Sequence, residues 1–154
     1  MSATAFTLDF DFDVDYNMIM MKVPLVDYLV LGDDPHLVVN ECTACSARFF
    51  DRRNACAACG SDAGFARVAV ARDGVLTTFT IVSFAAPGVT VPFVAGIVDC
   101  DGTSVRANIV NVEADPRHVQ LAMKVRLTTF PLGTDASGME AVAFGFEPYE
   151  SGAV

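Results

Sequence analysis

Short apolar runs separated by turn residues make up most of the chain from residue 65 to residue 148. These runs are rich in β-branched and aromatic residues, which is typical of strands. The expected strands are 68–71, 75–84, 93–99, 104–110, 124–130 and 141–147. Asp73-Gly74 and Asp101-Gly102 predict tight hairpin turns, and a glycine-rich loop at 133–138 joins the last two strands. Five or six short strands at this spacing predict a small closed barrel or a sandwich.

A different pattern covers residues 6–16, where apolar side chains alternate strictly with threonine and aspartate. This period of two predicts a half-buried strand. One interpretation is an edge strand of the chain's own sheet, whose charges oppose aggregation. Another is an arm that adds a strand to a partner subunit. A calcium-binding loop is less favoured, because the glycine and the closing glutamate of an EF-hand are missing.

The segment between this arm and the first cysteine begins with a methionine-rich run at residues 17–21. Pro24 then restricts Val23 to an extended conformation. Residues 25–31 predict a short helix that ends at Gly32 and presents Leu25 and Leu29, with Tyr28, on one face. We therefore assign residues 1–37 to an N-terminal arm with a short docking helix.

Four cysteines form the strongest motif in the chain. Cys42 and Cys45 make one CxxC pair, and Cys56 and Cys59 make a second after ten intervening residues. Two such pairs can place four thiolates around one zinc ion in a closed structural site. Iron in a rubredoxin-like shell is a less favoured alternative, and disulfides are disfavoured in a reducing compartment. Because four protein ligands leave no open position for water or substrate, we expect a structural zinc ion and no catalytic metal.

The stretch between the two cysteine pairs contains both basic and aromatic residues. Arg48, Arg52 and Arg53 are candidates for contact with an anion such as a phosphate, because residues 42–59 are the net-positive part of an acidic chain. The favoured interpretation is structural, with Phe49 and Phe50 covering a ribbon that is too small to have its own core. After the second CxxC pair, Gly60 can adopt a positive φ, whereas after the first pair the turn must tolerate the side chain of Ser46.

Composition and charge exclude several functional classes. The 154 residues are 53% hydrophobic with a mean hydropathy of +0.42 and a net charge of −9. Disorder and collagen-like fibres do not fit this composition, and no apolar run is long enough for a transmembrane helix. Eight of the acidic side chains lie in residues 1–41, against one basic residue, Lys22. We therefore expect no secretory signal, no membrane partner and a cytoplasmic location.

The chain offers no recognisable catalytic motif. His36 and His118 are the only histidines, and neither belongs to a Ser/His/Asp or Cys/His arrangement. Cys100 is the unpaired fifth cysteine and lies within an apolar strand, where a small buried side chain is the simplest interpretation. No P-loop and no GxGxxG motif is present. We therefore predict no catalytic residues in this chain.

The order of these units resembles the family of zinc-ribbon plus OB-fold accessory proteins associated with acyl-CoA enzymes. The resemblance covers about residues 24–148, and it departs from the common pattern at Ser46, where glycine is usual, and in the acidic arm. The motifs that carry it are Pro35-His36-Leu37, the two CxxC pairs, Arg48-Phe49-Phe50, Gly74-x-Leu76-x-x-Phe79-Thr80, Ala86-Pro87-Gly88 with Pro92-Phe93, and Val119-x-Leu121-x-Met123-x-Val125.

This resemblance implies a mainly β fold with an extended or helical N-terminal arm, a rubredoxin-like four-cysteine ribbon and a five-stranded OB-fold barrel. We place the ribbon at residues 38–64 and the barrel at residues 65–154. It also implies a non-catalytic subunit that stabilises a thiolase-superfamily enzyme, in a heterotetramer or larger assembly, and helps form its coenzyme A (CoA) or acyl-CoA site. Arg48, Arg52 and Arg53 are then the candidates for contact with the CoA phosphates. The partner would be a thiolase or a lipid-transfer-protein-like aldolase in the degradation of steroid, aromatic or other acyl-CoA compounds.

Two other functions remain as alternatives. OB-fold barrels bind single-stranded nucleic acids through aromatic platforms and basic grooves, but the negative charge of this chain opposes binding to a phosphate backbone. A free-standing acyl-CoA-binding protein is the second alternative. Submicromolar CoA binding by the isolated chain would favour it over a subunit that completes the pocket of a partner.

Overall fold

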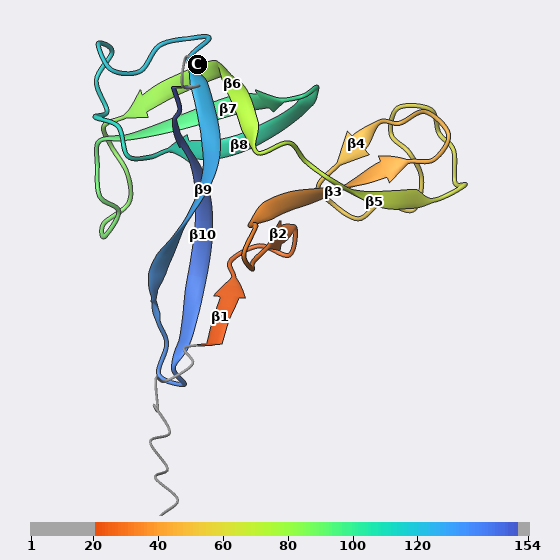
Figure 1. Ribbon diagram of the computed structural model, residues 1–154, viewed down its shortest axis with the longest axis horizontal. Coiled ribbons are helices and arrows are strands. Elements are labelled where there is room, and N and C mark those ends of the chain that lie inside the picture. Colours follow the sequence, from red (N-terminus) through yellow and green to blue (C-terminus); the bar gives the residue numbers. More distant parts are fainter. Residues whose placement is uncertain (1–20, 151–154) are drawn as a thin grey trace, which may run out of the picture.

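The computed structural model describes residues 21–150, and these residues form an all-β structure (Figure 1). None of the described segments is a helix with the length and apolar character needed to cross a membrane. The alternating segment 6–16 lies outside the described residues, so both interpretations of it stay predictions. The ten strands are β1 (Met21–Pro24), β2 (Leu29–Val30), β3 (His36–Cys42), β4 (Arg48–Phe49), β5 (Phe65–Ala69), β6 (Asp73–Val82), β7 (Phe93–Cys100), β8 (Thr103–Ile109), β9 (Lys124–Thr134) and β10 (Met139–Pro148).

Five strands close into a barrel in the order β6-β7-β8-β10-β9, with β9 returning to β6. Neighbouring strands are antiparallel except β8 and β10, which pair in parallel at Ile109 and Phe146. The predicted five-stranded barrel is therefore confirmed. The predicted turn at Asp101-Gly102 is also confirmed, since both residues have positive φ, 52° and 82°, between β7 and β8.

The other Asp-Gly pair is not a turn, and this prediction was wrong. Asp73 and Gly74 are the first residues of β6, where they pair with Arg126 and Val125 of β9. The expected hairpin partner of β6, strand β5, pairs with β3 instead. Gly74 is needed there for space, because a Cβ atom would lie 2.5 Å from Val98 Cγ1 and 2.7 Å from the carbonyl oxygen of Asp99. Glycine inside a strand often marks such a close approach.

The short helix predicted over residues 25–31 was also wrong, because residues 25–28 form bends and a turn and Leu29–Val30 is strand β2. Strand β1 lies parallel to the first half of β10, from Met21 opposite Met139 to Pro24 opposite Val142. A turn follows, and β2 pairs with β3. Strand edges supply hydrogen-bonding partners to this segment: the amide of Leu25 donates to the carbonyl of Val142 at 2.8 Å. The β9–β10 hairpin extends well beyond the barrel along this segment (Figure 1).

A second small sheet carries the cysteine pairs. Its central strand, β3, pairs with β5 on one side and with both β2 and β4 on the other. Residues 65–69, expected as part of the barrel unit, therefore extend the sheet of the ribbon. In Figure 1 this ribbon projects sideways from the barrel and ends in the two cysteine loops.

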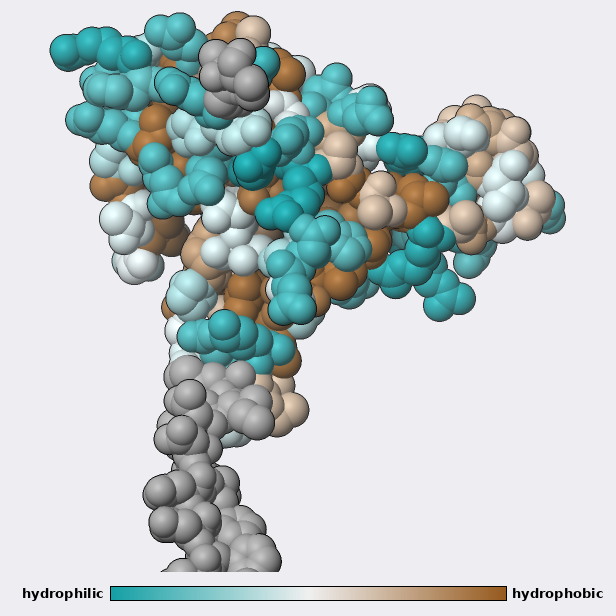
Figure 2. All heavy atoms as spheres, viewed as in Figure 1, coloured by the Kyte–Doolittle hydropathy of each residue, from teal (hydrophilic) through white to brown (hydrophobic). Residues whose placement is uncertain are grey.

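The ribbon and the barrel share one hydrophobic core. Leu37 and Val39 of β3 are almost fully buried, and they belong to the same cluster as Leu76, Val98 and Phe146 of the barrel. The ribbon thus does not need a separate core, which its few residues could not supply. Apolar side chains still reach the surface over β3, between the barrel and the cysteine loops (Figure 2).

Candidate metal centre and the ribbon–barrel junction

The structure brings Cys42, Cys45, Cys56 and Cys59 together at the end of the ribbon. All four sulfur atoms lie within 4.8 Å of one another. The Sγ atoms of Cys42 and Cys59 are 3.8 Å apart, and those of Cys45 and Cys56 are 3.6 Å apart. A tetrahedral site with metal–sulfur bonds of about 2.3 Å has sulfur–sulfur edges of about 3.8 Å. The donor set therefore fits a tetrahedral, four-thiolate metal ion.

The two cysteine loops have nearly the same backbone hydrogen bonds. In the first, the amide of Ser46 donates to the carbonyl of Cys42 at 2.9 Å, and in the second the amide of Gly60 donates to the carbonyl of Cys56 at 2.8 Å. The residue after each pair has a positive φ, 62° at Ser46 and 75° at Gly60. The expectation that the first turn tolerates a side chain is confirmed, with Ser46 in the left-handed region that favours glycine.

The pKa values of Cys45 and Cys56 are shifted in opposite directions. The backbone amides of Cys59 and Ala58 favour the thiolate of Cys56 more than desolvation disfavours it, which lowers the pKa of Cys56 to about 6. At Cys45, the backbone amide of Ala47 also favours the thiolate, but hydrogen bonds with the other thiols and desolvation outweigh it and raise the pKa to about 12. Because a metal ion binds thiolates, its binding must release the remaining protons.

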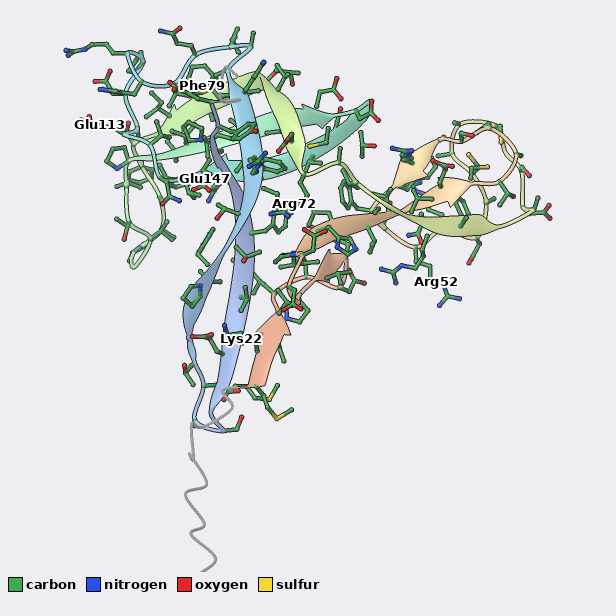
Figure 3. All side chains as sticks on the ribbon, viewed as in Figure 1. Lys22, Arg52, Arg72, Phe79, Glu113 and Glu147 are labelled. Carbon is green, nitrogen blue, oxygen red and sulfur yellow. The ribbon has the colours of Figure 1, made fainter. Side chains whose placement is uncertain are left out.

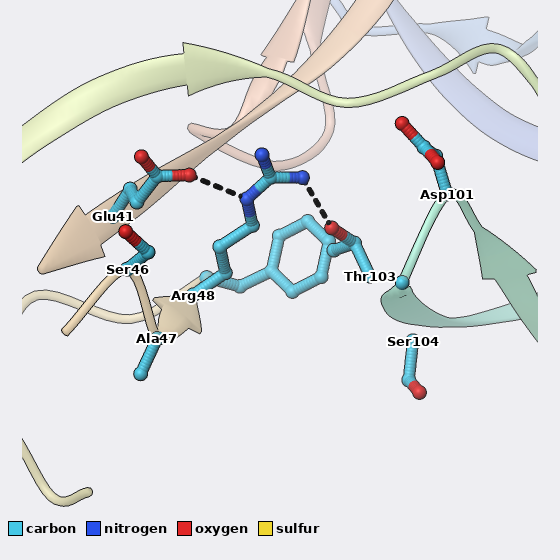
Figure 4. Close-up of a pocket in the computed structure, with 9 residues that line it drawn as sticks. Glu41, Ser46, Ala47, Arg48, Asp101, Thr103 and Ser104 are labelled. Carbon is cyan, nitrogen blue, oxygen red and sulfur yellow. Dashed lines mark hydrogen bonds and ion pairs between the residues drawn. The ribbon is translucent and has the colours of Figure 1, made fainter.

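Arg48 connects the ribbon to the barrel. Its Nε donates to Glu41 Oε2 at 2.7 Å, and its Nη1 donates to Thr103 Oγ1 of β8 at 2.9 Å (Figure 4). Thr103 is buried, so its hydroxyl depends on such a partner. These residues line a cavity of about 490 Å³ between the ribbon and the turn at Asp101 and Gly102. Arg48, one of the three candidates for phosphate contact, is therefore engaged within the molecule.

The other two candidate arginines differ from each other. Arg53 forms an ion pair with Asp51 at 3.1 Å and lies over the ring of Phe49, 4.7 Å from its centroid. Arg52 extends away from the ribbon (Figure 3), and no hydrogen bond or ion pair within residues 21–150 holds it. Of the three, Arg52 is thus the cation with no competing partner among the described residues.

An aromatic cluster that no sequence pattern predicted joins three parts of the chain. The ring of Tyr28 lies 4.7 Å from that of Phe50 in the ribbon and 5.9 Å from that of Phe144 in β10. Phe49 packs instead edge-on against Phe65 of β5, at 6.1 Å. The aromatic spacing from Tyr28 to Phe144 carries no sequence signal, because these contacts depend on how the ribbon folds back onto the barrel.

The remaining chemically interesting side chains lie apart from the cysteine cluster. His36 Nδ1 is 2.8 Å from the carbonyl oxygen of Asp34, and His118 lies on the connector, 3.6 Å from Glu113. Cys100 is fully buried, as expected, and its desolvation and the nearby charge of Asp99 raise its pKa to about 12. A thiol with this pKa is not an activated nucleophile at neutral pH.

Two family models match the two folded units in order. Residues 31–63 match the model described as the rubredoxin-like zinc ribbon domain of ChsH2, and residues 67–130 match that of the C-terminal OB-fold domain of ChsH2. Together these matches span more than half of the chain. No curated protein sequence matches it.

Among solved structures, the Ltp2-ChsH2(DUF35) aldolase has a similar fold. The match has a TM-score of 0.56 and 24% sequence identity, and it covers 73% of this chain and 84% of that one. The barrel topology, the four-cysteine ribbon and the two consecutive domain matches agree with one another. The chain belongs to the ChsH2 family of proteins with a rubredoxin-like zinc ribbon and an OB-fold domain.

Proposed function

We propose that this chain is a non-catalytic, zinc-binding accessory subunit of a thiolase-superfamily enzyme. The enzyme would act on steroid, aromatic or other acyl-CoA compounds in a degradative pathway, in a heterotetramer or larger assembly located in the cytoplasm. The observation that carries the proposal is the pair of consecutive ChsH2 domains, whose fold is that of the Ltp2-ChsH2(DUF35) aldolase. Under this proposal, the partner subunit supplies the catalytic residues.

The state of the candidate residues supports a non-catalytic role. Catalysis by a cysteine needs a thiolate close to a base, whereas Cys100 is buried with a raised pKa. The two histidines lie on separate segments, each beside acidic or backbone oxygen atoms. The aromatic residues support a protein-binding role over a nucleic-acid platform, because Phe79, Phe93 and Phe130 are half-buried and only Phe84 of these four is exposed.

The metal centre would act by holding the ribbon in shape. When bound, a zinc ion supplies four bonds that cross-link the two cysteine loops. Its thiolate ligands come from both ends of a segment that also contains Arg48, so the metal would fix the position of the contact to Thr103. We expect metal analysis of the purified protein to show one zinc ion per chain, and one iron ion would contradict this part of the proposal.

Co-purification of the full chain from its source cell tests the proposal. We expect a thiolase-fold protein to co-purify, and its turnover of acyl-CoA to fall when the accessory chain is removed. The proposal would be contradicted if no thiolase-fold protein co-purified with the chain, or if turnover of acyl-CoA were equal with and without the chain. The variant Cys56→Ser is expected to lose the metal and, with the ribbon, the partner. Full partner affinity in this variant would show that the ribbon is not part of the docking surface.

A variant of Arg52 tests whether this chain contributes to the CoA site of the complex. Because this guanidinium has no competing carboxylate among the described residues, it is the candidate best able to reach a phosphate. We expect Arg52→Ala to raise the KM of the complex for acyl-CoA about three- to tenfold, with kcat unchanged. Arg117→Ala is the matched control, since Arg117 is 87% exposed on the connector. An unchanged KM in Arg52→Ala would remove Arg52 from the site.

A further inference from the structure

The loop between β6 and β7, residues 83–92, is an exposed and uncharged projection of the barrel. Phe84 is the most exposed large hydrophobic side chain among the described residues, at 92%, and Val89 and Val91 are exposed as well. No Asp, Glu, Lys, Arg or His occurs from Gly74 to Val98, in a chain in which 19% of residues are charged. Figure 2 shows the end of this loop mainly in white and brown, the colours of neutral and hydrophobic residues.

The loop has a defined local structure. The pairing of β6 with β7 ends at Val82 and Phe93, and a turn within the loop is closed by a hydrogen bond of 3.1 Å from the amide of Val89 to the carbonyl of Ala86. Pro87 and Gly88 occupy the centre of this turn, and Gly88 has a φ of 91°. Proline followed by a residue with positive φ is the signature of a type II turn. A preformed turn lowers the entropy that binding must overcome.

The shape of this surface indicates what kind of partner could cover it. A side chain that is 92% exposed contacts few atoms of its own chain, so it cannot form the wall of a cavity that encloses a small ligand. None of the residues 21–150 covers it, so its burial requires a surface from outside these residues. A membrane surface is disfavoured because no basic residue lies in the loop or its flanking strands. A second copy is disfavoured because both copies would carry the net charge of −9.

We propose that the loop of residues 83–92 docks the chain onto its partner protein, with Phe84 inserted into an apolar pocket on the partner's surface. The identification of that partner as a thiolase-fold subunit rests on the function proposed above. The inserted aromatic ring would act as the energetic centre of the contact, as buried aromatic residues do at protein interfaces. The uncharged strands around it would approach the partner without desolvating charged groups.

Variants of two exposed apolar residues test the proposal. Phe84→Asp and Phe84→Ala are compared with Leu121→Asp. Leu121 is 63% exposed, next to Ala122, whose amide donates to the carbonyl of Leu76 at the opposite end of β6 from the loop. We expect Phe84→Ala to weaken binding of the co-purified partner about 10- to 100-fold and Phe84→Asp to weaken it further. Leu121→Asp should bind as the original chain does. Thermal unfolding checks that all three variants remain folded.

A spectroscopic measurement tests insertion directly. The chain contains no tryptophan, so fluorotryptophan incorporated at Phe84→Trp gives a single ¹⁹F signal from this chain. We expect the signal to shift when partner is added, and the signal from Leu121→Trp to stay in place. A shift with phosphatidylcholine or phosphatidylglycerol vesicles and no partner would overturn the proposal in favour of a membrane surface. Self-association that Phe84→Asp abolishes would overturn it in favour of a second copy.

Binding of the Phe84→Asp variant and the fold of the co-purified partner together distinguish failure of the docking role from failure of the proposed function. If a thiolase-fold partner binds Phe84→Asp as tightly as the original chain, the docking role of the loop is wrong and the proposed function stands. If a partner of another fold loses affinity for Phe84→Asp only, the docking role stands and the proposed function is wrong. If no protein co-purifies with the chain, both are wrong.

Discussion

Ser46 carries backbone strain that its counterpart Gly60 avoids. Both residues follow a cysteine pair with positive φ, and both donate an amide hydrogen bond to the first cysteine of that pair. A side chain in this left-handed region costs about 1 kcal/mol. We therefore expect Ser46→Gly to raise the free energy of unfolding by about this amount. Denaturant unfolding with the metal bound measures the change.

Gly60→Ala is the complementary variant, because it should change the free energy of unfolding in the opposite direction to Ser46→Gly. A Cβ atom on Gly60 would meet nothing within 4 Å, so only its φ of 75° opposes a side chain. We expect Gly60→Ala to lower the free energy of unfolding by about 1 kcal/mol. If Ser46→Gly destabilised the protein, the hydroxyl of Ser46 would have to make a contribution that exceeds the strain.

Strand β6 shows how packing at the level of elements assigns a residue its role. Gly74 lies where β6 passes close to β7, and a Cβ atom there would overlap Val98 and approach the sulfur of Cys100 to 2.9 Å. We expect Gly74→Ala to lower the free energy of unfolding by about 1–3 kcal/mol, because the barrel must move to relieve the overlap. Ser104→Ala on the exposed side of β8 should change it by less than about 0.5 kcal/mol. Equal effects in the two variants would contradict this account of Gly74.

The closure of the barrel between β6 and β9 is coupled to pH through Asp73. Arg126 donates to both oxygens of Asp73, at 2.7 and 3.2 Å, and its guanidinium lies 3.5 Å from the centroid of the Tyr149 ring. The hydrogen bonds from Arg126 lower the pKa of Asp73. A carboxyl group with a lowered pKa in the folded state stabilises that state above its unfolded pKa of about 3.9 and loses this effect as the pH falls through the folded value.

We therefore expect the stability of the original chain to fall more steeply below about pH 4 than that of Asp73→Asn. Unfolding measured by circular dichroism between pH 2 and pH 7 checks this slope. Asp62→Asn, a change at an exposed aspartate in the ribbon, serves as the control. A slope in Asp73→Asn equal to that of the original chain would show that the pair with Arg126 does not control the acid response.

For the whole molecule, Arg48 controls how the ribbon is attached to the barrel. Arg48 is held by Glu41 within the ribbon and donates across the junction to Thr103 of the barrel. Arg72 forms an ion pair with Asp34 near the point where the chain passes from ribbon to barrel. We expect Arg48→Met to lower stability by about 1–2 kcal/mol and to increase amide exchange in residues 41–50 and 103–105. Arg52→Met removes the same charge and should leave exchange in these segments unchanged. Equal exchange in both variants would contradict the role of Arg48.

The sequence by itself determined the local chemistry of this protein. Two CxxC pairs predicted the four-sulfur cluster, because two residues between cysteines suffice to turn both sulfurs toward one point. The alternation of short apolar runs predicted most strands of the barrel, and Asp101-Gly102 predicted its tight turn, since these patterns depend on neighbours in the chain. The burial of Cys100 likewise followed from its apolar surroundings in the sequence.

Only the tertiary structure decided the roles that depend on distant partners. Gly74 resembled a turn residue and proved to be a point of close strand contact, because the steric limit comes from β7. Residues 25–31, predicted as a helix, instead form a turn followed by β2, because β3 offers an edge with which Leu29 and Val30 pair. Arg48 became a bridge because Thr103 lies opposite it across the junction. A sequence pattern reflects interactions between residues that are close in the chain, whereas these roles depend on residues that are close only in space.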